Sequence, residues 1–242
     1  LAASVLHRAL TLKQKHPLPE TPVLGKAFDV SPDRSNSCPS IEEYDAFERK
    51  SPLAGMPYGL RLLECLLAAG CNVQLLYSQA AQVVARQEMD FELPSRPADA
   101  KTALLARLVA VDPEKLAVFG REEWFAPVAS GSNPPDAMVV CPCSMGTLAA
   151  IAQGLADNLI ERAADVVLKE GRKLVLVPRE TPFSTIHLEN MLRLARAGAV
   201  ILPPSPGFYQ HPQSVADIVD FVVARVLDQL AVPHALMQRW GA

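Results

Sequence analysis

The sequence lacks long hydrophobic runs and any excess of basic residues. Its apolar runs are interrupted by proline, glycine or a charged residue well before the roughly 20 residues that cross a bilayer. Lys and Arg number 23 against 26 Asp and Glu, a formal net charge of −3. A surface with this balance is a poor match for nucleic acid. We therefore expect neither a membrane span nor a nucleic-acid partner.

Cysteine is scarce, and its number is odd. The five cysteines are Cys38, Cys65, Cys71, Cys141 and Cys143. An odd number in a chain of this length is a poor disulfide framework and predicts reduced thiols in a cytoplasmic setting. Cys141 and Cys143 have the wrong spacing for a CxxC site, and no second Cys or His pair complements them. We expect ordinary buried thiols and no metal. A G-x-S-x-G sequence is also absent, which disfavours a nucleophilic serine.

Residues 1–53 differ in composition from residues 54–242. The first part is rich in proline and has no convincing strand pattern. It contains one candidate helix, Ile41–Lys50, which Ser40 would cap with Glu43 three residues later. We interpret residues 1–53 as an atypical N-terminal segment and residues 54–242 as an α/β domain.

From Gly55 onward, short apolar strands alternate with amphipathic helices. The expected strands are 72–77, 137–141, 173–177 and 199–202, and the expected helices are 58–69, 79–88, 99–109, 147–156, 159–170, 186–197 and 214–230. Residues 90–135 are otherwise expected to be irregular. Apolar, unalternating strands of this kind predict a parallel sheet with helices on both faces, a doubly wound flavodoxin-like or Rossmann-like fold.

Ligands of such sheets bind beyond the carboxyl ends of the strands. This rule selects the loops 142–147, 178–184 and 203–209. The first loop, with Ser144, is suited either to cradling a phosphate or flavin edge or to capping a helix. The second leaves its strand with Arg179 and Glu180, either as a functional loop or as a solvated turn. The third presents Tyr209 after a rigid, proline-rich connector.

Three cations outside these loops leave two interpretations open. Arg162 and Lys169 share one face of a predicted helix, as ligands of an anion or as members of a surface ion-pair stripe. Arg225 lies in an otherwise apolar helical segment, where it either extends to solvent or meets an anion. His187, His211 and His234 have no partner at metal spacing and are interpreted as structural.

Four strings together resemble the signatures of UbiX-type flavin prenyltransferases. They are VCPCSMGTL at 140–148, NLIERAADV at 158–166, LVPRETPFS at 176–184 and PGFY at 206–209. The resemblance extends from about residue 55 to residue 240. It implies a flavodoxin-like fold that assembles into a dodecamer and binds FMN and dimethylallyl phosphate without a metal. The product, prenylated FMN, would be the cofactor of a UbiD-type decarboxylase, as in ubiquinone biosynthesis.

The resemblance also implies roles for individual residues. Lys169, Tyr209 and Arg225 would bind the phosphate of the prenyl donor. Glu88, Lys169 and Glu180 would be catalytic, the two carboxyl groups as acid/base groups near the flavin. The residues implied to hold reduced FMN are Ala54, Gly55, Ser78, Ser144, Met145, Gly146, Thr147 and Arg162.

The chain departs from this family at its start. The family opens with an apolar strand and a Gly-Ala-Ser-Gly loop, where this chain has the charged stretch 44–50 and Pro52-Leu53-Ala54-Gly55. Losing the serine hydroxyl removes a hydrogen bond to a charged group, worth about 1.5–3 kcal/mol. We therefore hypothesise that residues 1–53 are a replaced segment that weakens FMN binding; insertion of part of Val23–Val30 as the missing strand would refute this.

Two alternatives belong to other classes. One is an FMN-binding flavoprotein of the phosphopantothenoylcysteine decarboxylase type, although His7 and His16 are poor matches for its early catalytic histidine. The other is a degenerate, non-catalytic homologue.

Overall fold

The computed structural model describes residues 55–109 and 111–238. The chain divides into two units, Leu1–Ile41 and Glu42–Ala242, and every described residue belongs to the second. The expected helix Ile41–Lys50, the segment Val23–Val30 and Ala54 lie outside the described residues.

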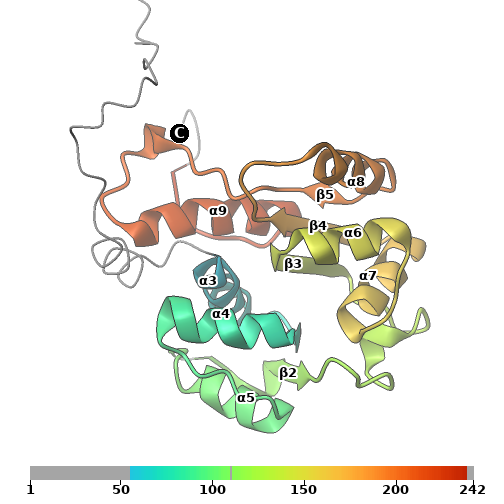
Figure 1. Cartoon of the computed structure of the whole chain (residues 1–242). Coiled ribbons are helices and arrows are strands. Elements are labelled where there is room, and N and C mark those ends of the chain that lie inside the picture. The colour runs from blue at the N-terminus through green and yellow to red at the C-terminus, as the bar shows by residue number, and fades with distance from the viewer. Residues whose placement is uncertain (1–54, 110, 239–242) are drawn as a thin grey trace, which may run out of the picture. The chain divides into compact units, whose positions relative to one another are not determined.

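The first group of elements surrounds a small parallel sheet (Figure 1). In chain order it comprises α3 (Met56–Ala68), β1 (Val73–Leu76), α4 (Gln79–Met89), α5 (Pro97–Leu105), η1 (Pro113–Lys115) and β2 (Leu116–Phe119). Strands β1 and β2 pair in parallel from Val73 with Leu116 to Leu76 with Phe119. Leu63 of α3, Leu104 of α5 and Leu116 of β2 are buried in the core that these elements share.

The second group contains a three-stranded parallel sheet in the order β3-β4-β5. Its elements are η2 (Pro127–Ala129), β3 (Ala137–Cys143), α6 (Met145–Gln153), α7 (Leu159–Lys169), β4 (Lys173–Pro178), α8 (Thr185–Arg196), β5 (Val200–Ile201), η3 (Phe208–Gln210) and α9 (Val215–Leu230).

Helices cover both faces of β4 because its apolar residues do not alternate with polar ones. Leu174 and Leu176 pack with α6, α7 and α8 on one face. Val175 and Val177 pack with α3 and α9 on the other, around Leu62. All four β4 side chains have no exposed area. This burial on two faces is what an uninterrupted apolar strand requires, and it places α7 and α9 on opposite sides of the sheet (Figure 1).

The predicted α/β class is confirmed, and most predicted elements are present within a few residues of their expected ends. The exception is β2, because the region 90–135 was expected to contain no strand. Residues Leu116–Phe119 form one by pairing with β1, which begins 43 positions earlier by residue number, 116 against 73. No helix among the described residues has both the length and the apolar character of a membrane span.

Candidate functional site

The carboxyl ends of β3 and β4 lie side by side. Cys143 is in register with Pro178, and the backbone N–H of Arg179 donates to the carbonyl oxygen of Cys143 at 3.2 Å. The loops that follow the two strands therefore start from one edge of the sheet. Ser144 and Arg179, the first residues after the strands, are brought to the same place.

The start of α3 reaches the same edge. Gly55 precedes the helix with φ +115°, a conformation open to glycine, and a Cβ on it would lie 3.0 Å from Cβ of Pro142 and 3.3 Å from Cδ of Arg179. The next residue, Met56, donates its backbone N–H to a carboxylate oxygen of Glu88 at 2.9 Å. Gly55, Glu88 and Arg179 are thus gathered where β3 and β4 end.

The environment of Glu88 raises the pKa of its carboxyl group above the ordinary value. Partial burial is the largest cause, and the hydrogen bond from Met56 and the positive charge of Arg179 oppose it. A carboxyl group with a raised pKa exchanges a proton more readily near neutral pH than an ordinary glutamate does. Glu88 can therefore act as an acid or a base at this edge.

The N-terminus of α6 supplies polar groups beside this cluster. The Ser144 hydroxyl accepts a hydrogen bond from the N–H of Thr147 at 3.1 Å and donates to the Thr147 side-chain oxygen at 3.1 Å. Gly146 is open, since a Cβ there would meet only the Ser144 hydroxyl, at 3.8 Å. The helix start can accept an anion or the polar edge of a flat ring, while Ser144 also acts as the N-cap.

Ser78 and Glu88 lie at opposite ends of α4. Ser78 follows β1 and caps the helix by accepting the N–H of Ala81 at 3.1 Å. Ten residues separate the two by residue number, 88 against 78, which is about 15 Å of helix. The structure therefore does not bring the side chain of Ser78 to that of Glu88.

Arg162 lies in the first turn of α7, and Lys169 is the last residue of that helix. Arg162 donates from Nε to the Ala129 carbonyl at 3.0 Å and forms an ion pair with Asp165 at 2.9 Å. Lys169 forms an ion pair with Glu170, close against Gly131. Because α7 ends at Lys169 and β4 begins at Lys173, Lys169 is near the amino end of β4, about 17 Å of strand from its carboxyl end.

Of the remaining predicted residues, Glu180 follows β4, whereas Tyr209 and Arg225 lie on η3 and α9. Glu180 follows Arg179 and is exposed, with its carboxylate accepting the N–H of Thr181 at 3.1 Å. Tyr209 lies in η3, where its half-exposed ring meets the edge of Phe221 at a centroid distance of 5.8 Å. Arg225 lies on α9 and pairs with Asp228 at 2.7 Å.

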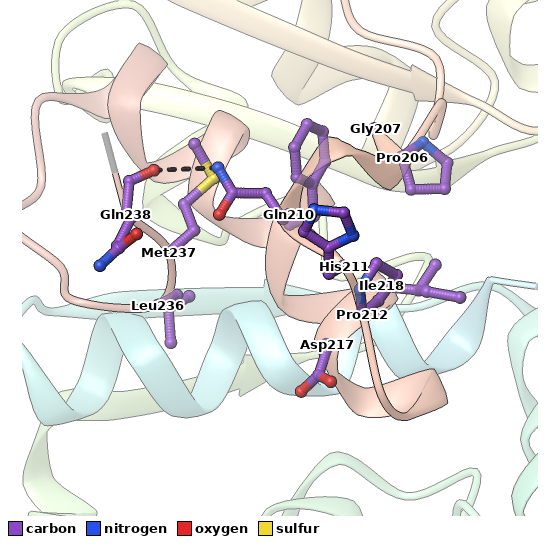
Figure 2. A pocket seen from close by; sticks show the side chains of 11 residues that line it. Pro206, Gly207, Gln210, His211, Pro212, Asp217, Ile218, Leu236, Met237 and Gln238 are labelled. Carbon is purple, nitrogen blue, oxygen red and sulfur yellow. Dashed lines mark hydrogen bonds between the residues drawn. The ribbon is translucent and has the colours of Figure 1, made fainter. Parts of the chain in front are cut away.

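A pocket of about 300 Å³ lies between η3, the start of α9 and residues 236–238. Figure 2 shows Gln210 reaching Gln238, whose carbonyl oxygen accepts from the Gln210 amide at 3.2 Å. Phe221 lines the pocket and also contacts the Tyr209 ring. The pocket therefore adjoins Tyr209, and it shares no residue with the cluster around Glu88.

Sequence reasoning did not assign roles to two members of the edge cluster. The N–H of Met56 and the charge of Arg179 both act on Glu88. The position of Arg179 directly after an apolar strand indicated a possible site residue. Nothing in the sequence indicated the contact between Met56 and Glu88. Burial raises the pKa of the thiols of Cys141 and Cys143 to about 12, which disfavours reactive thiolates; the Cys143 side chain is fully buried, whereas Cys141 is half-buried. No group of metal-ligating side chains occurs within residues 55–109 and 111–238.

Two family models match parts of the chain. The one described as "Flavoprotein" covers residues 53–227, and the one described as "Fatty acid cis/trans isomerase" covers residues 1–91. The second spans less than half of the chain and overlaps the first over residues 53–91. The family assignment therefore rests on the flavoprotein match.

Relatives and solved structures agree with that match. The chain is 57% identical over 188 residues to the flavin prenyltransferase UbiX of Pseudomonas aeruginosa. This alignment covers 78% of this chain and 90% of that protein. The dodecameric FMN-dependent UbiX-like decarboxylase of Escherichia coli O157:H7 aligns with a TM-score of 0.68 and 44% identity, over 79% of this chain and 96% of that one.

A second solved structure, AnUbiX in complex with FMN and dimethylallyl pyrophosphate, aligns with a TM-score of 0.68 and 40% identity. The alignment covers 79% of this chain and 94% of that one. Identities this high over nearly the whole length of the relatives leave one conclusion. The chain belongs to the UbiX-type flavin prenyltransferase family.

Proposed function

We propose that this chain transfers a dimethylallyl group from dimethylallyl phosphate to reduced FMN. The bond between the allylic carbon and the phosphate oxygen breaks, the allylic carbon bonds to the flavin, and phosphate leaves. The observation that carries the proposal is the cluster of Gly55, Glu88 and Arg179 beside the start of α6, in a chain 57% identical to a flavin prenyltransferase.

The chemistry of the α6 terminus fits FMN. Gly146 leaves its side of the helix open, and the hydroxyls of Ser144 and Thr147 can hydrogen-bond to a polar ring edge or a phosphate. We propose that Ser144, Met145, Gly146 and Thr147 hold FMN, together with Ala54, Gly55, Ser78 and Arg162. When bound and reduced, FMN supplies the electron-rich ring on which the prenyl group is accepted.

Glu88 and Glu180 are proposed as the proton-handling groups. The raised pKa of Glu88 suits a group that must both hold and release a proton. Glu180 is exposed at the same edge, one residue beyond Arg179. A carboxyl group on each of two loops allows one to take a proton while the other supplies one.

Lys169, Tyr209 and Arg225 are proposed to bind the donor's phosphate. Loss of the prenyl group leaves extra negative charge on phosphate, and two cations with a phenol hydroxyl stabilise that charge mainly in the transition state. Lys169 contributes to catalysis in this way as well as to binding. Each cation has a carboxylate partner, Glu170 for Lys169 and Asp228 for Arg225, so the phosphate must compete with an exposed ion pair.

This phosphate site requires more than one copy of the chain. Lys169 lies near the amino end of β4 on the face covered by α7, whereas Arg225 belongs to α9 on the opposite face. We propose that neighbouring copies bring the two cations together beside the flavin site of one copy. The dodecameric state of the Escherichia coli relative supports a homo-oligomer of this kind.

The wider role follows from the product. We propose that prenylated FMN is delivered to a UbiD-type decarboxylase, in a cytoplasmic setting that suits the reduced cysteines. The flavoprotein match over residues 53–227 supports residues 54–242 as the flavin-binding domain and residues 1–53 as a separate segment.

A donor comparison tests the proposal. The full chain is incubated with reduced FMN and either dimethylallyl phosphate or dimethylallyl diphosphate, and the flavins are separated by chromatography. We expect prenylated flavin from the monophosphate. Unchanged FMN with both donors, under conditions in which FMN binds, would contradict the proposal.

A further inference from the structure

Asp228 connects Arg225 to a buried histidine. Its Oδ2 atom accepts a hydrogen bond from Nη1 of Arg225 at 2.7 Å, and its Oδ1 atom lies 3.2 Å from Nε2 of His234. Exposure falls along this series, because the side chains of Arg225, Asp228 and His234 are 48%, 21% and 7% exposed. The series therefore leads from a cation at the surface to an imidazole in the interior.

A backbone group fixes the proton of the His234 ring. The N–H of Leu236 faces Nδ1 of His234 at 3.4 Å. A backbone N–H can only donate, so Nδ1 is the acceptor and Nε2 carries the proton in the neutral ring. The Nε2–H group of His234 therefore donates to the Asp228 carboxylate.

A tight turn after α9 brings His234 back to this carboxylate. The helix ends at Leu230, and Ala231 reverses the chain with φ +56°. The N–H groups of Ala231 and Val232 then donate to the carbonyl oxygens of Asp228 and Leu227, at 3.2 and 3.0 Å. The turn is therefore closed on the last residues of the helix.

Apolar contacts hold the segment on both sides of His234. Val232 and Leu236 pack against the buried cluster that contains Val223 and Leu227 of α9. His234 lies between these two contacts in the sequence. Its ring is thus held against α9 by the backbone turn before it and by packing on either side.

The ion pair leaves much of the Arg225 guanidinium available to an anion. Nη1 makes the hydrogen bond to Asp228, whereas a guanidinium has five N–H groups on three nitrogens. Competition between Asp228 and a phosphate is then confined to one nitrogen. A side chain that is already held in place loses less conformational freedom when it binds an anion.

We propose that His234 is a positioning residue of the donor's phosphate site. It orients Asp228 so that Oδ2 faces Arg225, and Asp228 holds the guanidinium where it meets the phosphate. This role rests on the proposed function, in which Arg225 binds the phosphate of the prenyl donor. His234 acts through Asp228 and is not itself a ligand of the donor.

Three substitutions of His234 separate positioning from packing. His234→Phe keeps a ring but removes the donor to Asp228. His234→Asn can still accept from Leu236 but is too short to reach Asp228, so it removes the same contact with a polar side chain. His234→Gln is the conservative variant, because its amide can place a donor near the position of Nε2.

The first readout is transfer from dimethylallyl phosphate to reduced FMN. We expect kcat/KM for the donor to fall about tenfold in His234→Phe and His234→Asn, because Arg225 is then less well placed. His234→Gln should recover most of this loss. FMN affinity, measured by fluorescence titration, should be nearly unchanged in all three, whereas a residue with only a packing role would change stability and leave the donor kinetics alone.

A double-mutant cycle tests the route through Asp228. Asp228→Asn should lower kcat/KM for the donor by itself. Adding His234→Phe to Asp228→Asn should then cost little more, because the contact through which His234 acts has already been altered. Fully additive losses would show that His234 acts by another route and would overturn the inference.

The second readout needs neither flavin nor donor. Inorganic phosphate that binds the folded chain raises its unfolding temperature. Arg225→Ala should reduce this rise. His234→Phe and His234→Asn should reduce it in the same direction, and His234→Gln should reduce it less.

The outcomes distinguish this role from the proposed function. If Arg225→Ala weakens both readouts while His234→Phe and His234→Asn weaken neither, the positioning role is wrong and the proposed function stands. If Arg225→Ala changes neither readout, the proposed phosphate site is wrong and the role of His234 falls with it. Losses in His234→Gln as large as those in His234→Phe would also contradict positioning by the Nε2 donor.

Discussion

The backbone N–H of Met56 donates to the carboxylate of Glu88 at 2.9 Å, linking the first residue of α3 to the last turn of α4. The contact spans 32 residues of sequence. It holds the acid/base candidate beside Gly55 and Arg179, at the edge where β3 and β4 end. The position of Glu88 therefore depends on how α3 begins.

Glu88→Gln should become more stable relative to the wild type as pH rises. The pKa of Glu88 is raised in the folded state, so the unfolded state loses this proton at lower pH than the folded state does. The contribution of Glu88 to the free energy of unfolding is fully present below its ordinary pKa and falls as pH rises through the folded pKa. Glutamine keeps an oxygen for the Met56 N–H and does not titrate. Urea unfolding of both proteins across the acidic range measures the difference, and a constant difference would contradict the prediction.

Gly59→Ala should destabilise the protein although alanine favours helices. The added Cβ would lie 2.8 Å from the Cys141 carbonyl oxygen, so α3 must move away from β3. We expect a loss of about 1–3 kcal/mol in the free energy of unfolding. Gly146→Ala is the matched control, because its Cβ would meet only the Ser144 hydroxyl, at 3.8 Å. Thermal unfolding should show the control as stable as the wild type or more so; equal effects of both changes would argue against close contact of α3 and β3.

Arg61→Ala should loosen the packing of α3 on α9. Arg61 binds both carboxylate oxygens of Asp220, at 2.7 and 3.2 Å, and also contacts Glu64 at 2.7 Å. The pair is partly exposed, so we expect a loss of about 1 kcal/mol that shrinks at high salt. Arg96→Ala is the control, since Arg96 and Asp99 are more exposed and 3.8 Å apart. Denaturant unfolding at low and high salt measures both losses. Equal losses of unfolding free energy in the two variants would contradict the prediction.

The fold was largely predictable because its signals are local. Asn158 caps α7 by accepting the N–H groups of Ile160 and Glu161, and such a cap is visible in the sequence. The buried strand β4 is visible as a continuous apolar run. Strand β2 was missed because four residues in a proline-containing region carry little signal of their own, and pairing with β1 is what makes them a strand.

The site was predictable in part. The rule that ligands bind at the carboxyl ends of parallel strands located Ser144, Arg179 and Glu180. Glu88 was selected only through the family resemblance, since its hydrogen bond to Met56 depends on tertiary packing. Lys169 shows a different limit, because its position near the amino end of β4 follows from chain order, while the role we propose for it requires a neighbouring copy.

Lys169→Ala and Tyr209→Phe should each slow prenyl transfer while leaving FMN affinity nearly unchanged. Both residues are proposed to contact the donor's phosphate, so their loss raises the barrier by an amount that corresponds to about 10²–10³ in rate. Lys101→Ala, on α5, is the control for removal of a positive charge. Single-turnover rates and flavin fluorescence titrations separate the two effects. A large loss of FMN affinity in both variants would show that the two residues bind FMN and not the donor's phosphate.

Mixed oligomers test whether neighbouring copies share the phosphate site. Lys169→Ala and Arg225→Ala should each be nearly inactive alone. Refolding the two variants together should restore part of the activity, because some sites then receive an intact lysine and an intact arginine from different copies. Mixing either variant with itself is the control. No recovery in mixtures whose hetero-oligomers are seen by native mass spectrometry would place both cations in one copy.

Mass spectrometry of the flavin after anaerobic incubation of the full chain with reduced FMN and dimethylallyl phosphate tests for prenyl transfer itself. A parallel titration measures FMN binding. We expect flavin that carries one added prenyl unit, with FMN affinity weakened by the change from Gly-Ala-Ser-Gly to Pro52-Leu53-Ala54-Gly55. Bound FMN that remains unmodified in the presence of the donor would contradict this expectation.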